Sequence, residues 1–153
     1  MTASRRTLFA AFAVGLLAIA GAHAQDTKPH RVVIQVDQND PAVMNLALNN
    51  AQNVVQYYRD KHEDADVEIV AYGPGLNMLR ADTSSVKDRI AQIASSDATF
   101  PSKIVFSACN NTKQAMERRE GHPITIIPQA RIVPSGVVRI MELEEQGWSY
   151  VRP

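Results

Sequence analysis

The sequence has one cysteine, Cys109, among its 153 residues. A single cysteine cannot form an internal disulfide, so this thiol is a buried apolar side chain, a partner for another molecule or a reactive group. Metal binding has no support, because Cys109, His62 and His122 lack the spacing of known metal sites. The glycines form neither a dinucleotide nor a P-loop fingerprint. The sequence therefore predicts no metal and no cofactor.

The sequence also has no excess of positive or negative charge. The chain has 16 Lys and Arg residues and 16 Asp and Glu residues, and it has no basic tract interleaved with aromatic side chains. Nucleic acid is therefore not an expected partner. Four acidic residues fall between Glu63 and Glu68, and we interpret them as a solvated face.

Residues 1–24 have the pattern of an export signal. Arg5 and Arg6 precede an apolar run over residues 8–20, and Ala22-His23-Ala24 is a cleavage site of the A-x-A type. The run is short for a membrane span, so we expect no stable membrane anchor after cleavage. Residues 25–153 would then form a single domain in the periplasm or outside the cell. We expect export by the general secretory route. The twin-arginine route is the alternative, because S-R-R-T-L-F partly matches the twin-arginine signal motif.

The domain alternates between two kinds of pattern. Apolar runs of the length of buried strands are separated by segments with apolar residues at helical spacing. Such alternation with short connections predicts an α/β fold, a three-layer sandwich with a mostly parallel sheet of about five strands. The expected strands cover residues 31–37, 67–72, 104–106, 131–133 and 148–151, and the expected helices begin near Asp40, Ser84, Asn110 and Ser135, with a short helical turn at 76–80.

Cys109 lies between an expected strand and an expected helix. Asn110 or Asn111 would cap this helix, and the free N–H groups of its first turn would favour a thiolate over a thiol. Cys109 is therefore a candidate nucleophile. A structural, buried thiol is the alternative, and the residues alone leave both interpretations open.

Several polar and glycine-containing loops are expected at the same edge of the sheet. Ligands of open parallel sheets bind beyond the carboxyl ends of the strands. The candidate residues for binding a substrate or an anion there are Gly73, Gly75, Asn77, Asn110, Asn111, Thr112 and Ser135.

Three segments together resemble the DsrE/DsrF-like family, particularly its exported single-domain members: V-E-I-V-A-Y-G-P-G-L-N-M-L, I-V-F-S-A-C-N-N-T and I-V-P-S-G-V-V-R-I-M-E-L-E-E-Q-G-W-S-Y-V-R-P. The resemblance implies a parallel-sheet fold, assembly into homo- or hetero-oligomers, and a persulfide carried on Cys109. It also places residues 110–112 and 73–77 on the two loops that face each other at the site. Related sequences often have His where this chain has Tyr72, and the known sulfur relays of the family are cytoplasmic.

The leading hypothesis is a periplasmic sulfur carrier or sulfurtransferase, with an unknown sulfur donor and acceptor thiol, that works as a homo-oligomer. One alternative is a binding module for a small ligand or anion, in which Cys109 only forms a wall. Another is a partner-binding subunit that seats a second chain on apolar patches at Met44, Met78 or Met141. His122 lies in a Gly-His-Pro turn, and we identify no general base.

Overall fold

The computed structural model describes residues 28–97 and 103–153, so the expected signal at residues 1–24 lies outside the described residues. One five-stranded sheet has the order β4-β3-β2-β1-β5, and every neighbouring pair is parallel. The predicted α/β architecture is confirmed. The strands are β1 (His30–Val36), β2 (Ala65–Ala71), β3 (Lys103–Cys109), β4 (Ala130–Val133) and β5 (Ser149–Val151).

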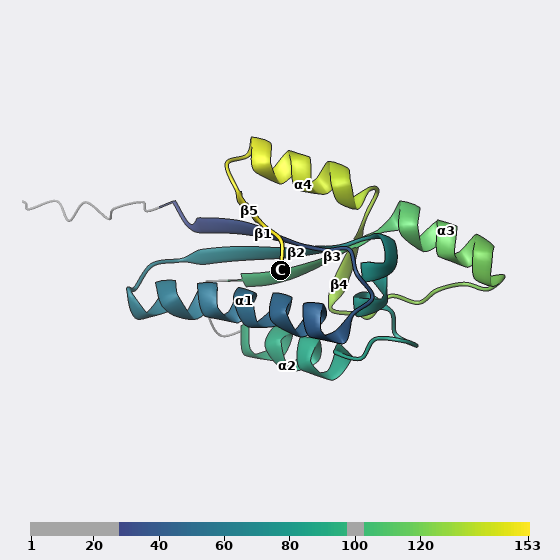
Figure 1. The fold of residues 1–153 in the computed structure, drawn as a ribbon. Coiled ribbons are helices and arrows are strands. Elements are labelled where there is room, and N and C mark those ends of the chain that lie inside the picture. Colours follow the sequence, from purple (N-terminus) through teal and green to yellow (C-terminus); the bar gives the residue numbers. More distant parts are fainter. Residues whose placement is uncertain (1–27, 98–102) are drawn as a thin grey trace, which may run out of the picture.

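The helices form two unequal layers. In Figure 1, α1 and α2 cover one face of the sheet, α4 covers the other, and α3 projects beyond the carboxyl ends of the strands. The α1 and α2 face holds the large apolar core, whereas the apolar cluster under α4 has only four fully buried members, Val33, Val70, Ile140 and Leu143. The helices are α1 (Pro41–Asp60), α2 (Lys87–Asp97), α3 (Asn110–Glu120) and α4 (Gly136–Glu145), with a 3-10 helix, η1 (Gly73–Leu79).

The start of α1 follows from local sequence. The side chain of Asp40 accepts a hydrogen bond from the amide of Ala42 at 2.8 Å, and Pro41 occupies the first position, where its missing N–H costs nothing. Met44, Leu48 and the other buried residues of α1 recur at helical spacing, which fixes the face that packs on the sheet.

Several expectations need correction. Cys109 itself caps α3, in place of Asn110 or Asn111. The short helical turn expected at 76–80 is a 3-10 helix that begins earlier, over residues 73–79. Met44 and Met78 are 1% and 0% exposed, so neither can seat a partner chain, whereas Met141 is 53% exposed. In the part of the chain that the structure describes, no helix is long and apolar enough to span a bilayer.

Candidate functional site

The thiol of Cys109 is surrounded by hydrogen-bond donors. Its Sγ atom lies at the end of β3 and accepts a hydrogen bond from the amide of Thr112 at 3.5 Å. Asn111, Gly136 and the hydroxyl of Thr112 lie near enough to the sulfur to favour its charged form. Two of these residues belong to α3, but Gly136 is the first residue of α4, from the far end of the chain. Residues from the starts of two helices therefore influence one sulfur atom.

These donors change the ionisation of the thiol. Burial disfavours the charged form and on its own raises the pKa of Cys109, but the hydrogen bonds from Thr112, Gly136 and Asn111 outweigh it. The pKa of Cys109 therefore lies below the ordinary value for cysteine. A larger thiolate fraction at neutral pH makes the sulfur a better nucleophile and a better anion.

Access to the sulfur is limited. Cys109 is 4% exposed, which is much less than a residue in an open polar crevice would be. It nevertheless belongs to neither apolar cluster, and its sulfur accepts a hydrogen bond from a backbone amide. The site thus combines an ionisable thiol with a nearly closed entrance.

Tyr72 lies at the end of β2 beside this thiol. A Cβ atom added to Gly136 would lie 2.8 Å from the Cβ of Tyr72, so the start of α4 packs directly on this ring and requires a glycine. Burial and the neighbouring charge of Asp37 raise the pKa of Tyr72. Its hydroxyl therefore stays neutral at physiological pH and is not a general base.

A hollow of about 550 Å³ lies next to the thiol at the carboxyl edge of the sheet. Asn111 and Thr112 line it, and Thr112 also donates its amide hydrogen to Sγ, whereas Cys109 does not line the hollow. The lining combines amide side chains and one guanidinium with a few apolar groups: Asn39, Gly73, Pro74, Asn77, Asn111, Thr112, Ala115, Met116 and Arg119.

The glycines of η1 have different roles from one another. The amide of Gly73 donates to the hydroxyl of Thr112 at 2.9 Å, which joins η1 to α3. Gly75 does not line the hollow: a Cβ there would lie 2.2 Å from the carbonyl oxygen of Val36, so this glycine allows η1 to pack against the end of β1. Asn77 lines the hollow, but its amide already pairs with Pro74 and Thr83.

The remaining candidates lie apart from this hollow. Ser135 lines a separate hollow of about 320 Å³ with Arg131 and Arg139, and its side chain makes no capping hydrogen bond. Asn110 is the first residue of α3 and lines neither of these two hollows. The structure therefore brings together Gly73, Asn77, Asn111 and Thr112 beside Cys109, but not Gly75, Asn110 or Ser135.

Comparison with known proteins finds a solved structure with a similar fold. The chain is similar to a solved structure, that of MTH1491 from Methanobacterium thermoautotrophicum, a protein of unknown function. The two are 29% identical with a TM-score of 0.67, and the similarity covers 81% of this chain and 99% of MTH1491. No protein-family model matches the chain, and no curated protein does either. The relative supports the α/β fold and assigns no activity.

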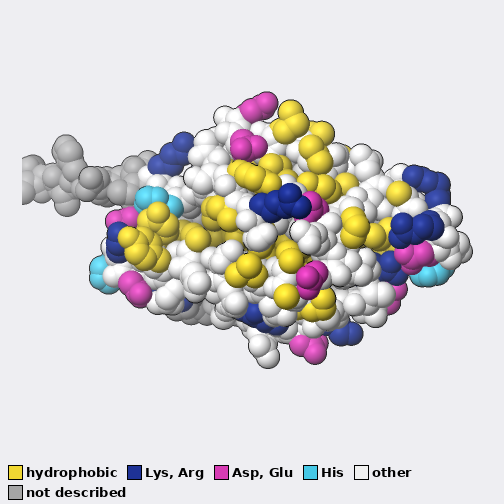
Figure 2. Space-filling model, in the orientation of Figure 1, with side chains coloured by type: hydrophobic (Ala, Val, Ile, Leu, Met, Phe, Trp, Pro, Cys, Tyr) yellow, Lys and Arg dark blue, Asp and Glu magenta, His cyan; other side chains and the backbone are white. Residues whose placement is uncertain are grey.

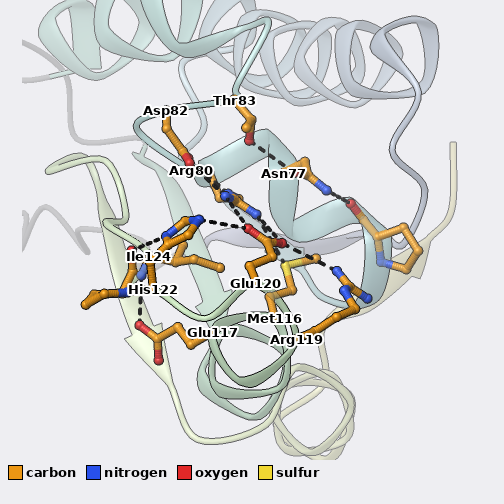
Figure 3. A network of polar contacts seen from close by, with 12 residues as sticks. Asn77, Arg80, Asp82, Thr83, Met116, Glu117, Arg119, Glu120, His122 and Ile124 are labelled. Atoms are coloured by element: carbon orange, nitrogen blue, oxygen red, sulfur yellow. Dashed lines mark hydrogen bonds and ion pairs between the residues drawn. The ribbon is translucent and has the colours of Figure 1, made fainter.

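Arg80, a buried arginine that the sequence did not single out, stabilises the helix that lines the hollow. The Arg80 side chain is 5% exposed and pairs with Asp82 at 2.7 Å and with Glu120 at 2.9 Å (Figure 3). Arg80 holds the pKa of Asp82 at about 2. Because Glu120 ends α3, this network fixes the helix that carries Met116 and Arg119 of the hollow.

His122 also belongs to that network. Its Nε2 atom lies 3.7 Å from a carboxylate oxygen of Glu120, so the ring sits at the end of α3 that is opposite to Cys109. Among the described residues, no group of three or more His, Cys, Asp or Glu side chains is placed to hold a metal ion.

Proposed function

We propose that the protein is an exported member of the DsrE/DsrF-like family that carries sulfur as a persulfide on Cys109. The observation that carries this proposal is the position of the Cys109 sulfur at the N-cap of α3, where it accepts a hydrogen bond from the amide of Thr112 and where Asn111 and Gly136 also favour its charged form. Such donors stabilise an anion at that position, and both the attacking thiolate and the persulfide anion are anions on sulfur.

The proposed chemistry needs no redox partner. The Cys109 thiolate attacks the outer sulfur of a donor persulfide, a new S–S bond forms, and the S–S bond of the donor breaks to release its thiolate. An acceptor thiolate then attacks the outer sulfur on Cys109, takes it as a persulfide and restores the Cys109 thiolate. Each step exchanges one S–S bond for another, so no net electron transfer occurs.

The hollow beside Thr112 is the proposed approach for the sulfur donor. Thr112 and Asn111 line the hollow, Cys109 does not, and Cys109 is only 4% exposed. A donor must therefore displace part of this wall before the thiolate can attack. We expect small sulfane-sulfur compounds to load Cys109 faster than bulky ones.

Intact mass spectrometry after incubation with inorganic polysulfide tests the proposal. The wild-type protein should gain the mass of one sulfur atom, and Cys109→Ser should gain none, because the hydroxyl cannot form a persulfide. Circular dichroism of both proteins checks that the fold is retained. An adduct that persists in Cys109→Ser, or that never forms in the wild type, would remove Cys109 as the carrier.

The low exposure of Cys109 favours a second candidate function, a binding module for a small anion. In this case the hollow holds the ligand, Arg119 supplies charge at its rim, and Cys109 is part of the wall. Isothermal titration with thiosulfate distinguishes the two. Equal affinity of wild type and Cys109→Ser, without any sulfur adduct, would support the binding module.

We also propose that the mature protein acts in the periplasm after removal of residues 1–24, and that it assembles as a homo-oligomer. The outer face of α4 supports the second point, because Val137, Val138 and Met141 are each about half exposed. Figure 2 shows hydrophobic side chains gathered over α4 at the top of the view. Burial of such a patch against a second copy would remove apolar surface from water.

A further inference from the structure

A buried carboxylate lies under α4, on the same sheet as Cys109. Glu68 is in the middle of β2 and is 2% exposed. Its two oxygens accept hydrogen bonds from the hydroxyl of Ser107 at 2.6 Å, from Arg131 at 2.7 Å, and from Arg139 at 2.9 and 2.8 Å. A buried carboxylate is stable only when it is paired and hydrogen-bonded in this way.

The cluster joins four elements of the site. Glu68 is on β2, Ser107 on β3, Arg131 on β4 and Arg139 on α4, and Arg131 also donates to Ser107 at 3.0 Å. Ser107 precedes Cys109 by two residues, so both side chains lie on the same face of β3. The cluster therefore links the strand that ends in the thiol to the helix that begins three residues after Val133, the strand partner of Cys109.

Apolar packing contributes little at the start of α4. Val137 and Val138 are 50% and 51% exposed, and the buried residues of this helix beyond Gly136 are Ile140 and Leu143. The first turn is instead held by the contact of Gly136 with Tyr72 and by the pair between Arg139 and Glu68.

We infer that Glu68 is a positioning residue for Cys109: through Arg139 and Arg131 it holds the N-terminal end of α4, and with it Gly136, in place near the thiol. Its functional meaning rests on the proposed role of Cys109. The geometry itself, however, can be tested without any sulfur donor.

Glu68→Gln separates positioning from a simple effect of charge, because the two act in opposite directions. If Glu68 acted only through its charge, its removal would leave two guanidinium groups less neutralised, favour the thiolate and lower the pKa of Cys109. If Glu68 positions α4, its removal moves Gly136 away from the sulfur, the thiolate loses the stabilisation that Gly136 gives it, and the pKa of Cys109 rises. The direction in which the pKa of Cys109 shifts therefore distinguishes positioning from a charge effect.

The measurement is the rate of iodoacetamide alkylation of the folded protein as a function of pH. The midpoint of this profile reports the ionisation of Cys109, whereas the plateau rate reports access of the reagent to the sulfur. A variant that only opens the site to the reagent therefore changes the plateau rate and leaves the midpoint where it was. We expect Glu68→Gln to move the midpoint up by about half to one pH unit, a three- to tenfold smaller ionisation constant. Tyr72 does not interfere, because its pKa is raised above the ordinary tyrosine value.

Two further variants complete the test. Arg139→Lys keeps the charge but cannot form the two-point contact, so a smaller upward shift is expected. Glu142→Gln is the control, since its carboxylate is 52% exposed and touches Arg139 only from outside, at 3.6 Å. If Glu68→Gln does not fold, an upward shift of the midpoint in Arg139→Lys supports the positioning role in its place.

An unchanged or lower midpoint in Glu68→Gln, or in Arg139→Lys where the first variant does not fold, would overturn the positioning role. This outcome is independent of the persulfide. The midpoint can shift as expected while polysulfide leaves no adduct, in which case the proposed function fails and the positioning role stands.

Discussion

At the scale of single residues, Cys109 combines a lowered pKa with very little exposure. Burial usually raises the pKa of a thiol, and here it is outweighed by the donors of α3 and by the amide of Gly136. Ionisation and access are therefore separate properties of this site. A reagent that needs only the thiolate will report the first, whereas transfer of sulfur requires both.

The hydroxyl of Thr112 offers a direct test of the donors. It accepts from the amide of Gly73 at 2.9 Å and lowers the pKa of the neighbouring Cys109 thiol, and Thr112→Val removes it while keeping the branched shape. We expect the pKa of Cys109 to rise, measured by the pH midpoint of alkylation. Thr125→Val, at an exposed position, is the matched control. Equal midpoints in the two variants would show that the hydroxyl does not stabilise the thiolate.

The sequence predicted the place of Cys109 but not its surroundings. The strand–helix boundary is a local property, and the structure confirms it. The cap was wrong because β3 stays paired with β4 up to Cys109 and Val133, so the thiol itself reaches the cap position. Gly136 is 27 residues further along the chain than Cys109. No local sequence pattern therefore indicates that Gly136 lies near the sulfur.

At the scale of elements, hydrophobic periodicity was sufficient for the strands and helices, but not for the charged residue inside a strand. Glu68 was interpreted as part of a solvated acidic face, and it is 2% exposed. Its position between Val67 and Ile69 was the available signal, because neighbouring strand residues face opposite sides of a sheet covered by helices on both sides. The partners, Arg131 and Arg139, could not be predicted without the tertiary structure.

The Glu68 cluster predicts a pH-dependent contribution to stability. Burial raises the pKa of Glu68, but hydrogen bonds from Arg139, Ser107 and Arg131 outweigh it, so the net shift is downward. A carboxyl with a lowered pKa stabilises the folded state above its unfolded pKa, near pH 4.5, and loses this contribution as the pH falls through the folded value. We therefore expect Glu68→Gln to cost about 2–3 kcal/mol in free energy of unfolding at pH 7.

Urea unfolding of wild type and Glu68→Gln at pH 7 and at about pH 3 measures this contribution. The difference between the two proteins should shrink at the lower pH. Glu144→Gln, at an exposed position of α4, should change little at either pH. A difference of the same size at both pH values would contradict the assigned ionisation of Glu68.

At the scale of the whole molecule, the two faces of the sheet are unlike each other. The α1 and α2 face has a continuous apolar core, whereas the α4 face combines a small apolar cluster with the Glu68 cluster and carries exposed valines outside. The architecture was predictable from the alternation of patterns and is shared with MTH1491, a protein of unknown function. Fold similarity of this kind does not determine function, so the activity must be argued from the site.

The exposed face of α4 predicts self-association. Val138→Asp places a charge in the patch formed by Val137, Val138 and Met141, so it should convert a homo-oligomer to monomer in sedimentation velocity. Leu46→Asp, at a 45% exposed position on α1, should leave the assembly intact. A wild-type monomer, or an oligomer that Val138→Asp does not affect, would rule out this surface.

The most direct test of the central claim is a sulfur-transfer measurement on Cys109. Wild-type protein is incubated with polysulfide, freed of excess reagent, and followed by intact and peptide mass spectrometry before and after addition of a small thiol. We predict the gain of one sulfur atom on the peptide that contains Cys109, and its complete loss to the added thiol. A protein that gains no sulfur at Cys109, or that gains it and does not yield it, would contradict the account.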